Sequence, residues 1–185
     1  MTKAQLTVLA GPTAVGKGTV VAALTKRYST LKVSVSATTR DPRPGELNGV
    51  HYYFVSPQEF DAMIERGDML EWALVHRKNK YGTPRGPVDE ALNAGHPVLL
   101  EIDLAGARQV RANRPDAQFI FLAPPSWEEL ERRLIGRGTE GPEEQARRLA
   151  TARVELQAAS EFDHVVINDD VERAVDELAR LIGLE

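Results

Sequence analysis

The chain has 185 residues, of which 42% are hydrophobic and 27% are charged, and it contains no cysteine. This composition predicts a folded domain with a substantial core rather than a disordered chain. The lack of cysteine excludes disulfides, thiolate nucleophiles and cysteine-ligated metals. The net charge of −4 argues against a protein that follows nucleic-acid phosphates, because such proteins usually carry a basic face.

The remaining bulk features exclude two further classes. The four histidines, at 51, 76, 96 and 164, do not stand at the spacing of metal ligands, so no zinc site is expected. No apolar run reaches the roughly 18 residues of a membrane span. The apolar stretch before Gly11 is too short for a signal peptide. We therefore expect a soluble, cytoplasmic protein with no nucleic-acid or membrane partner.

Strand and helix patterns alternate along most of the chain. The predicted strands are 5–10, 32–36, 52–55, 70–76, 97–102, 118–122 and 165–167. The predicted helices are 17–28, one that Ser56-Pro57 opens, 87–94, 103–113, 126–135, 142–160 and 171–181. This order favours an α/β fold, in which helices cover both faces of a parallel sheet. The segment 37–90 interrupts the alternation and contains an exposed loop at 39–49, so it is predicted to be an inserted lobe.

A phosphate-binding motif stands between the first strand and the first helix. Its pattern, G-x-x-x-x-G-K, is present as Gly11-Pro12-Thr13-Ala14-Val15-Gly16-Lys17. Glycines let the backbone curl so that successive N–H groups point at phosphate oxygens. The positive end of the next helix and the charge of Lys17 add to this attraction. The motif predicts a bound nucleotide but does not name a reaction.

The motif departs from the usual pattern after its lysine. The Ser or Thr that normally follows and binds Mg²⁺ is replaced by Gly18, and Thr19 comes next. Two alternatives stay open. Either Thr19 contributes to the ion, or Mg²⁺ is held mainly by phosphates and by the waters that it retains readily.

Charged residues suited to a second substrate follow later in the chain. Arg40 and Arg43 lie three residues apart in the exposed loop, and arginine forks suit the terminal oxygens of a monophosphate. Solvated loop charges are the alternative interpretation. Glu101 and Asp103 close an apolar strand, so their carboxylates are expected at the carboxyl edge of the sheet, where α/β proteins bind ligands.

Taken together, these motifs resemble those of the guanylate kinase family. The shared patterns cover essentially the whole chain in the family's order. They are S-x-T-T-R-x-P-R-x-G-E at 36–46, N-G-x-x-Y-x-F at 48–54, E-W-A at 71–73, Y-G-T at 81–83, E-I-D at 101–103, A-P-P-S at 123–126, R-L-x-x-R-G-T-E at 133–140 and N-D-D at 168–170. Two departures are small. Ala14 replaces a usual loop glycine, which is expected to stiffen the loop, and Ala37 replaces a frequent serine.

The resemblance implies a P-loop nucleoside monophosphate kinase that transfers the terminal phosphoryl group of ATP directly to GMP, with Mg²⁺ as cofactor. The implied ATP site consists of the phosphate loop with Gly18, Thr19, Arg137 and Asn168. The implied GMP site consists of Ser36, Arg40, Arg43, Tyr52, Glu71, Tyr81, Thr83, Glu101, Asp103 and Arg148. The implied catalytic residues are Lys17, Arg40, Arg137 and Arg148.

The resemblance also implies individual roles. Ser36, Arg40, Arg43, Tyr52 and Tyr81 would hold the GMP phosphate. Glu71 and Thr83 would read guanine with Glu101 beside them, and Asp103 would support the Mg²⁺ shell or the acceptor ribose. Arg137 and Arg148 would close over the transferring phosphoryl group, and Asn168 would lie near adenine. The single domain would divide into a core (1–36, 91–135 and 149–185), a GMP-binding lobe (37–90) and a lid (136–148).

Structural alternatives exist for these candidates. Glu71 can pair with Arg66 or Lys78, and Arg148 can pair with Glu144. Arg137 can be solvated, the tyrosines can be packing residues, and Asn168 can cap the helix that begins near Val171. For the whole chain, the alternatives are a non-catalytic binding module of the same family and a kinase for another nucleoside monophosphate. The sequence predicts a monomer or a weak homo-oligomer.

Overall fold

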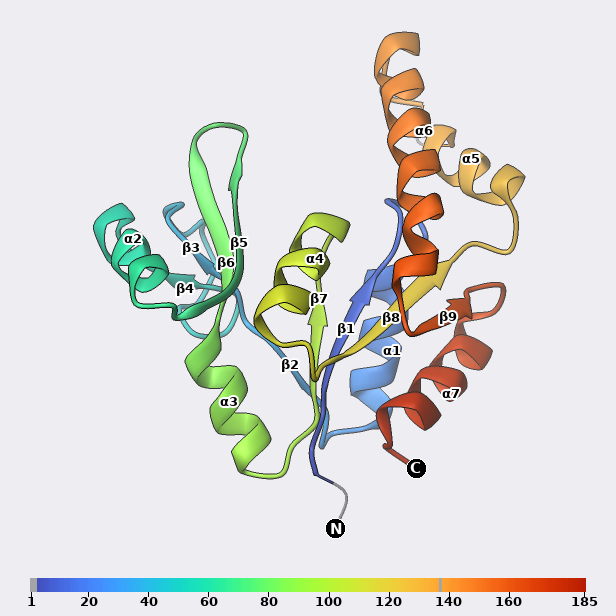
Figure 1. Cartoon of the computed structure of the whole chain (residues 1–185). Helices are drawn as coiled ribbons and strands as arrows, with labels where there is room; N and C mark the ends of the chain where they lie inside the picture. The colour runs from blue at the N-terminus through green and yellow to red at the C-terminus, as the bar shows by residue number, and fades with distance from the viewer. Residues whose placement is uncertain (1–2, 137) are drawn as a thin grey trace.

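A parallel sheet of five strands lies at the centre of the protein (Figure 1). The structure is a computed structural model that describes residues 3–136 and 138–185. The strand order is β2-β7-β1-β8-β9, and each neighbouring pair is parallel. The strands are β1 (Leu6–Ala10), β2 (Lys32–Val33), β7 (Val98–Glu101), β8 (Gln118–Ala123) and β9 (His164–Ile167). The predicted α/β fold is therefore confirmed.

Helices cover both faces of this sheet. Successive side chains of a strand point to opposite faces. Leu9 of β1 accordingly packs with the helices α1 (Lys17–Arg27) and α7 (Val171–Ile182). Val8 of the same strand packs on the other face with α4 (Leu104–Asn113) and α3 (Arg85–Asn93). Burial on both faces explains why every residue of β1 except Thr7 is apolar.

The two helices α5 (Trp127–Ile135) and α6 (Pro142–Gln157) pack on each other through a small core of their own. Leu130 and Leu134 of α5 meet Ala152 of α6 there. Ser126 caps α5 by accepting a hydrogen bond from the N–H of Glu129 at 3.1 Å, as predicted. A 3₁₀ turn (Ala158–Glu161) follows α6. The far end of α6 extends beyond the carboxyl ends of the core strands (Figure 1).

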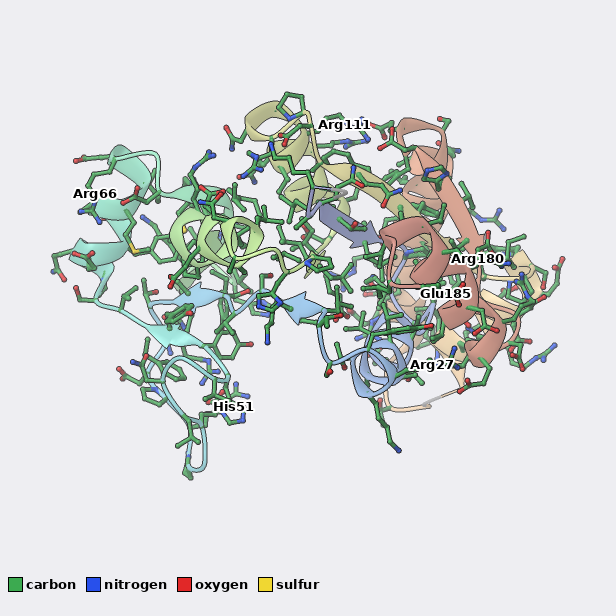
Figure 2. The ribbon with its side chains drawn as sticks, turned by 90° about the horizontal axis from the view of Figure 1, so that it is seen from below. Arg27, His51, Arg66, Arg111, Arg180 and Glu185 are labelled. Atoms are coloured by element: carbon green, nitrogen blue, oxygen red, sulfur yellow. The ribbon has the colours of Figure 1, made fainter. Side chains whose placement is uncertain are left out.

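A second, mixed sheet stands beside the core, with the strand order β4-β3-β6-β5. Its strands are β3 (Ala37–Thr38), β4 (Tyr53–Phe54), β5 (Met69–Val75) and β6 (Asn79–Pro84). Helix α2 (Pro57–Glu65) buries Phe60 against Ala37 and Met69 of this sheet. Ser56 caps α2 and Pro57 occupies its first turn, as the sequence predicted. Seen from below, His51 and Arg66 mark this end of the molecule, opposite Arg27 and Arg180 (Figure 2).

Three strands differ from the prediction. The strand predicted at 32–36 is shorter, because β2 ends at Val33. The chain then crosses to the second sheet, where β3 was not predicted. Strand β6 was missed, since a glycine and a proline at 82 and 84 weaken the strand pattern. Gly82 is required there, because a Cβ would stand 2.6 Å from the carbonyl oxygen of Glu71 on the paired strand. The other predicted elements are present, with ends that differ by a few residues.

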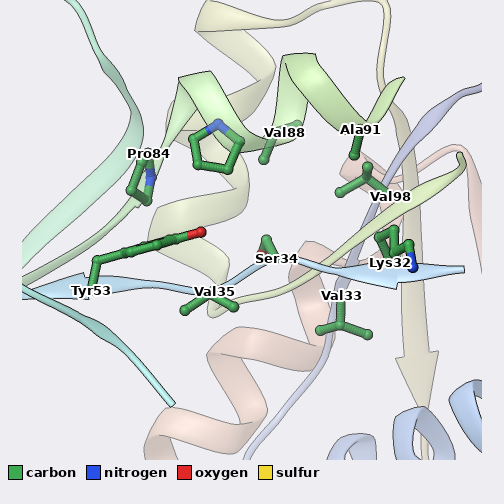
Figure 3. A pocket seen from close by; sticks show the side chains of 10 residues that line it. Lys32, Val33, Ser34, Val35, Tyr53, Pro84, Val88, Ala91 and Val98 are labelled. Atoms are coloured by element: carbon green, nitrogen blue, oxygen red, sulfur yellow. The ribbon is translucent and has the colours of Figure 1, made fainter. Parts of the chain in front are cut away.

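The chain crosses between the two sheets twice, after β2 and after β6. A small cavity of about 80 Å³ lies at these crossings, lined by Val33, Tyr53, Pro84, Val88 and their neighbours (Figure 3). None of the residues predicted for the functional site lines it. The exact limits predicted for core, lobe and lid stay a prediction. Among the described residues, no helix combines the length and hydrophobicity needed to cross a bilayer.

Candidate active site at the carboxyl edge of the core sheet

The phosphate loop leads from the carboxyl end of β1 into α1. Gly16 caps α1 with a φ of 97°, a left-handed conformation that favours glycine. Gly11 packs so closely on β8 that a Cβ would stand 2.4 Å from the carbonyl oxygen of Leu122. Both motif glycines are thus required by the shape of the loop. Ala14 also has a positive φ, 70°, which explains why a glycine is usual at this position.

Two side chains from distant parts of the chain hold the bend of this loop. The amide nitrogen of Asn168 donates to the carbonyl oxygen of Val15 at 2.9 Å, and the guanidinium of Arg133 donates to the same oxygen at 3.1 Å. Asn168 is buried, and its backbone N–H donates to the carbonyl oxygen of Ala123 at 2.8 Å. The alternative of Asn168 as a helix cap is wrong, because Asp170 caps α7. The predicted contact with adenine stays a prediction.

Lys17 lies in a partly buried site rich in carboxylates. Its ammonium donates to the carbonyl oxygen of Gly11 at 2.6 Å. Burial lowers the pKa of Lys17, while the charges of Glu155, Glu101 and Asp103 oppose that shift. Burial also raises the pKa of Glu155, and Lys17 counteracts this. Glu155 comes from α6 and no sequence motif pointed to it, so its place beside the phosphate loop is a finding of the tertiary structure.

The two candidate residues for Mg²⁺, Thr19 and Asp103, carry hard oxygen donors. Thr19 is exposed in the first turn of α1. Near this turn, a carboxylate oxygen of Glu101, a residue predicted for the GMP site, lies 4.0 Å from the position of a Cβ on Gly18. Asp103 caps α4 by accepting from the N–H of Gly106 at 2.8 Å. Within residues 3–136 and 138–185, no three acidic or histidine side chains are grouped to bind a metal directly. This donor set suits an ion that is held through phosphates and waters.

Three of the candidate residues for a monophosphate, Arg40, Tyr52 and Tyr81, meet on the second sheet, while Arg43 is exposed. Arg40 lies with its guanidinium carbon 5.3 Å from the ring centre of Tyr52, and its Nε donates to the hydroxyl of Tyr81 at 3.3 Å. The rings of Tyr52 and Tyr81 are edge to face with centres 5.9 Å apart. Ser36 immediately precedes β3, and its carbonyl oxygen accepts a hydrogen bond from the N–H of Tyr53. Arg40 is therefore a fixed group, which the solvated-loop alternative did not predict.

Glu46 holds Arg40 in this arrangement. Its carboxylate accepts two hydrogen bonds from the guanidinium, at 2.8 and 3.0 Å, and a third from the N–H of Arg43 at 2.7 Å. These bonds lower the pKa of Glu46 to about 2. Glu46 was part of a recognised motif but was given no role by sequence reasoning. Its role could have been inferred from its position three residues after Arg43, because the two residues lie in the same turn.

Glu71 and Thr83 are opposite each other on β5 and β6. The hydroxyl of Thr83 donates to the Glu71 carboxylate at 2.8 Å. Burial raises the pKa of Glu71, and the neighbouring charge of Asp103 adds to the shift. The predicted alternative of a pair with Arg66 is wrong, because Arg66 binds Glu59 and Asp68. Glu71 is thus a half-buried acceptor aimed at the start of α4.

Arg148 lies on α6 and faces the phosphate loop. It pairs with Glu140 at 2.5 Å and more distantly with Glu144 at 3.8 Å, so the ion pair foreseen as an alternative is present. An open pocket of about 360 Å³ separates this part of α6 from Thr13 of the loop. Arg137, the other predicted lid arginine, lies outside the described residues.

The structure therefore brings the predicted residues into three groups. The phosphate loop with Lys17 forms the first, the cluster around Arg40 forms the second, and the pair Glu71–Thr83 lies with Asp103 at the start of α4 between the two sheets. Such a layout suits two substrates with facing phosphates. One phosphate chain would lie on the loop and one monophosphate on the second sheet.

Comparisons with known proteins agree with this layout. The family model "Guanylate kinase" matches residues 3–185. A guanylate kinase of Leifsonia xyli is 61% identical over 96% of this chain and 70% of its own length, and one of Thermobifida fusca is 60% identical over 97% and 91%. The crystal structure of a guanylate kinase from Anaplasma phagocytophilum has a TM-score of 0.70 and 31% identity, and the match covers 97% of this chain and 84% of that chain. A shikimate kinase from Bacteroides thetaiotaomicron, at a TM-score of 0.51 and 14% identity over 97% and 98%, shares the fold alone.

Proposed function

Because the chain belongs to the guanylate kinase family, we propose that it transfers the terminal phosphoryl group of ATP to GMP, giving ADP and GDP. The observation that carries this proposal is the half-buried Glu71–Thr83 pair beside the Arg40 cluster. Guanine presents N1–H and an exocyclic amino group side by side, and one carboxylate can accept from both. Adenine presents a lone pair at N1 instead, which would face the carboxylate and repel it.

The proposed role of Thr83 follows from its hydrogen bond. Its hydroxyl has one proton, which it donates in the hydrogen bond to Glu71, so Thr83 would orient the carboxylate for guanine. Donation from Thr83 to O6 of guanine would require the hydroxyl to give up its hydrogen bond to Glu71. Glu101 would lie beside guanine, and Asp103 would support the Mg²⁺ shell or the acceptor ribose.

Phosphoryl transfer requires positioning and charge neutralisation rather than covalent chemistry. Arg40 and Arg43, with Ser36, Tyr52 and Tyr81, would hold the GMP phosphate in line with the terminal phosphate of ATP. Lys17 would bind the phosphates of ATP, and Arg137 and Arg148 would close over the transferring group. Mg²⁺, when bound through ATP phosphates and waters near Thr19 and Asp103, would neutralise developing charge.

Closure of the site would suppress hydrolysis, because water competes with GMP as the acceptor. The proposed moving parts are the lid at 136–148 and the lobe at 37–90. Arg148 pairs with Glu140 in the structure, so its proposed contact with the transferring phosphate would replace this partner. Small-angle scattering with and without a bisubstrate analogue tests this step, and an unchanged radius of gyration would contradict it.

A coupled ADP-release assay with GMP, AMP, CMP and UMP in parallel tests the function. We expect turnover with GMP and Mg²⁺ that exceeds turnover with each of the other three by orders of magnitude. Preference for another monophosphate would identify a different kinase. Binding of GMP without release of ADP would identify a non-catalytic module.

A further inference from the structure

Strand β5 is an edge strand of the second sheet, paired on one side with β6. In an antiparallel pair, the backbone groups of alternate residues point away from the partner strand. An edge therefore presents unpaired N–H and C=O groups that must find partners elsewhere. In this protein the groups on either side of Glu71 find them on α4, which lies between the β5–β6 hairpin and the core sheet (Figure 1).

Two amide side chains of α4 bind the backbone of β5. The amide nitrogen of Gln109 donates to the carbonyl oxygen of Trp72 at 2.9 Å, and its amide oxygen accepts from the N–H of Trp72 at 3.0 Å. These two bonds replace those that a neighbouring strand would make. Asn113, one helical turn later, donates to the carbonyl oxygen of Leu70 at 2.9 Å. The three bonds thus grip the residues immediately before and after Glu71.

The same face of α4 also limits the position of the Glu71 side chain. Gly106 precedes Gln109 by one helical turn, and a Cβ on Gly106 would stand 3.2 Å from a carboxylate oxygen of Glu71. Leu70 is fully buried in the same apolar cluster as Val110 of α4. Backbone, side chain and packing therefore all hold β5 to α4 at the level of Glu71.

We propose that Gln109 and Asn113 are positioning residues, which set the Glu71 carboxylate at the register needed to read guanine. This inference rests on the proposed function. The second sheet belongs to the acceptor side, whereas α4 leads directly from the core strand β7, so their relative position is not set by the β-ladder of either sheet. A carboxylate that accepts two parallel hydrogen bonds tolerates little displacement, because such bonds weaken steeply with angle. The three hydrogen bonds from Gln109 and Asn113 to β5 fix the position of the second sheet relative to α4.

The test compares the wild-type enzyme with Gln109→Leu, which keeps the approximate size of the side chain and removes two hydrogen bonds. Inosine monophosphate is the diagnostic second acceptor, because it lacks the exocyclic amino group that the second oxygen of Glu71 would bind. We expect the KM for GMP to rise about tenfold and the GMP:IMP ratio of kcat/KM to fall by a similar factor, while the KM for ATP changes less than about twofold. Amide exchange at Trp72, measured by NMR, should become faster.

Arg108→Leu is the matched control, because Arg108 lies on the same helix and uses two hydrogen bonds to hold Glu161. This variant should leave the GMP:IMP ratio at the wild-type value. If Gln109→Leu does not fold, Asn113→Leu removes one bond and should give a smaller change in the same direction.

Two results would overturn the positioning role. One is an unchanged GMP:IMP ratio in Gln109→Leu while the Trp72 amide exchanges faster. The other is an equal rise of KM for GMP and ATP, which would indicate general loosening. A wild-type chain that phosphorylates no GMP would instead overturn the proposed function and this inference with it.

Discussion

Glu71→Gln removes one charge and one acceptor from the proposed guanine site and leaves its shape intact. The glutamine can still accept the 2.8 Å hydrogen bond from Thr83, so the site should stay folded around it. Towards guanine, however, the amide accepts one hydrogen bond and turns a donor to the other guanine donor. A lost hydrogen bond to a charged group typically costs about 1.5–3 kcal/mol, which corresponds to roughly 10- to 150-fold in kcat/KM.

The same substitution should not destabilise the protein. Burial raises the pKa of Glu71, which means that the folded state disfavours the ionised carboxylate. Near neutral pH this ionised group therefore lowers the free energy of unfolding, and the neutral amide removes that penalty. We expect equal or slightly higher stability together with much lower activity on GMP.

The assay is the GMP:AMP ratio of kcat/KM in the two proteins, together with denaturant unfolding. Glu59→Gln serves as a control, because Glu59 is an exposed acid that pairs with Arg66 on the surface of α2. In the wild type, lowering the pH through the raised pKa of Glu71 should increase the KM for GMP, beginning above the ordinary glutamate range. An unchanged GMP:AMP ratio in Glu71→Gln would refute the reasoning, and guanine would have to be read elsewhere.

Four further changes test other parts of the site. Lys17→Ala should lower kcat at least about 100-fold, since a charge on the transferring phosphate is worth several kcal/mol, and near-normal turnover of a folded variant would disprove the phosphate-loop role. Arg137→Ala should lower kcat far more than it raises the KM for GMP, whereas a pure KM effect would indicate ground-state binding. Glu46→Gln should release Arg40 and raise the KM for GMP, with little change in the KM for ATP. A KM for GMP equal to that of the wild type would show that Arg40 does not need Glu46 to hold it. Ala14→Gly should stabilise the chain in denaturant unfolding by up to about 1.6 kcal/mol. The left-handed conformation of Ala14 costs roughly 1–2 kcal/mol, and this is offset by the roughly 0.4–1 kcal/mol of entropy that glycine adds to the unfolded state. A loss of stability would contradict this.

Local sequence determined the elements and the phosphate loop. Apolar periodicity and capping residues act over a few neighbours, so α1, α5 and β1 could be predicted from residues that lie next to each other. The loop glycines are equally local, because their left-handed or tightly packed backbone depends on the absence of a side chain at that position. Strand β6 was missed for the converse reason, since Gly82 is required by its close packing on Glu71 and Trp72 of β5, which the local sequence does not show.

Only the tertiary structure decided which side chains support the site. The charge of Glu155 on α6 acts on Lys17. Asn168, just after β9, and Arg133 of α5 bind the phosphate loop, and Gln109 of α4 binds β5. A lone glutamate or glutamine on a helix carries no local signal for such a contact, because its partner is distant in sequence and its direction depends on how the elements pack. The proposed substrate-binding residues are specified by motifs, while the residues that hold them in position are specified by the relative placement of α4, α6 and the two sheets.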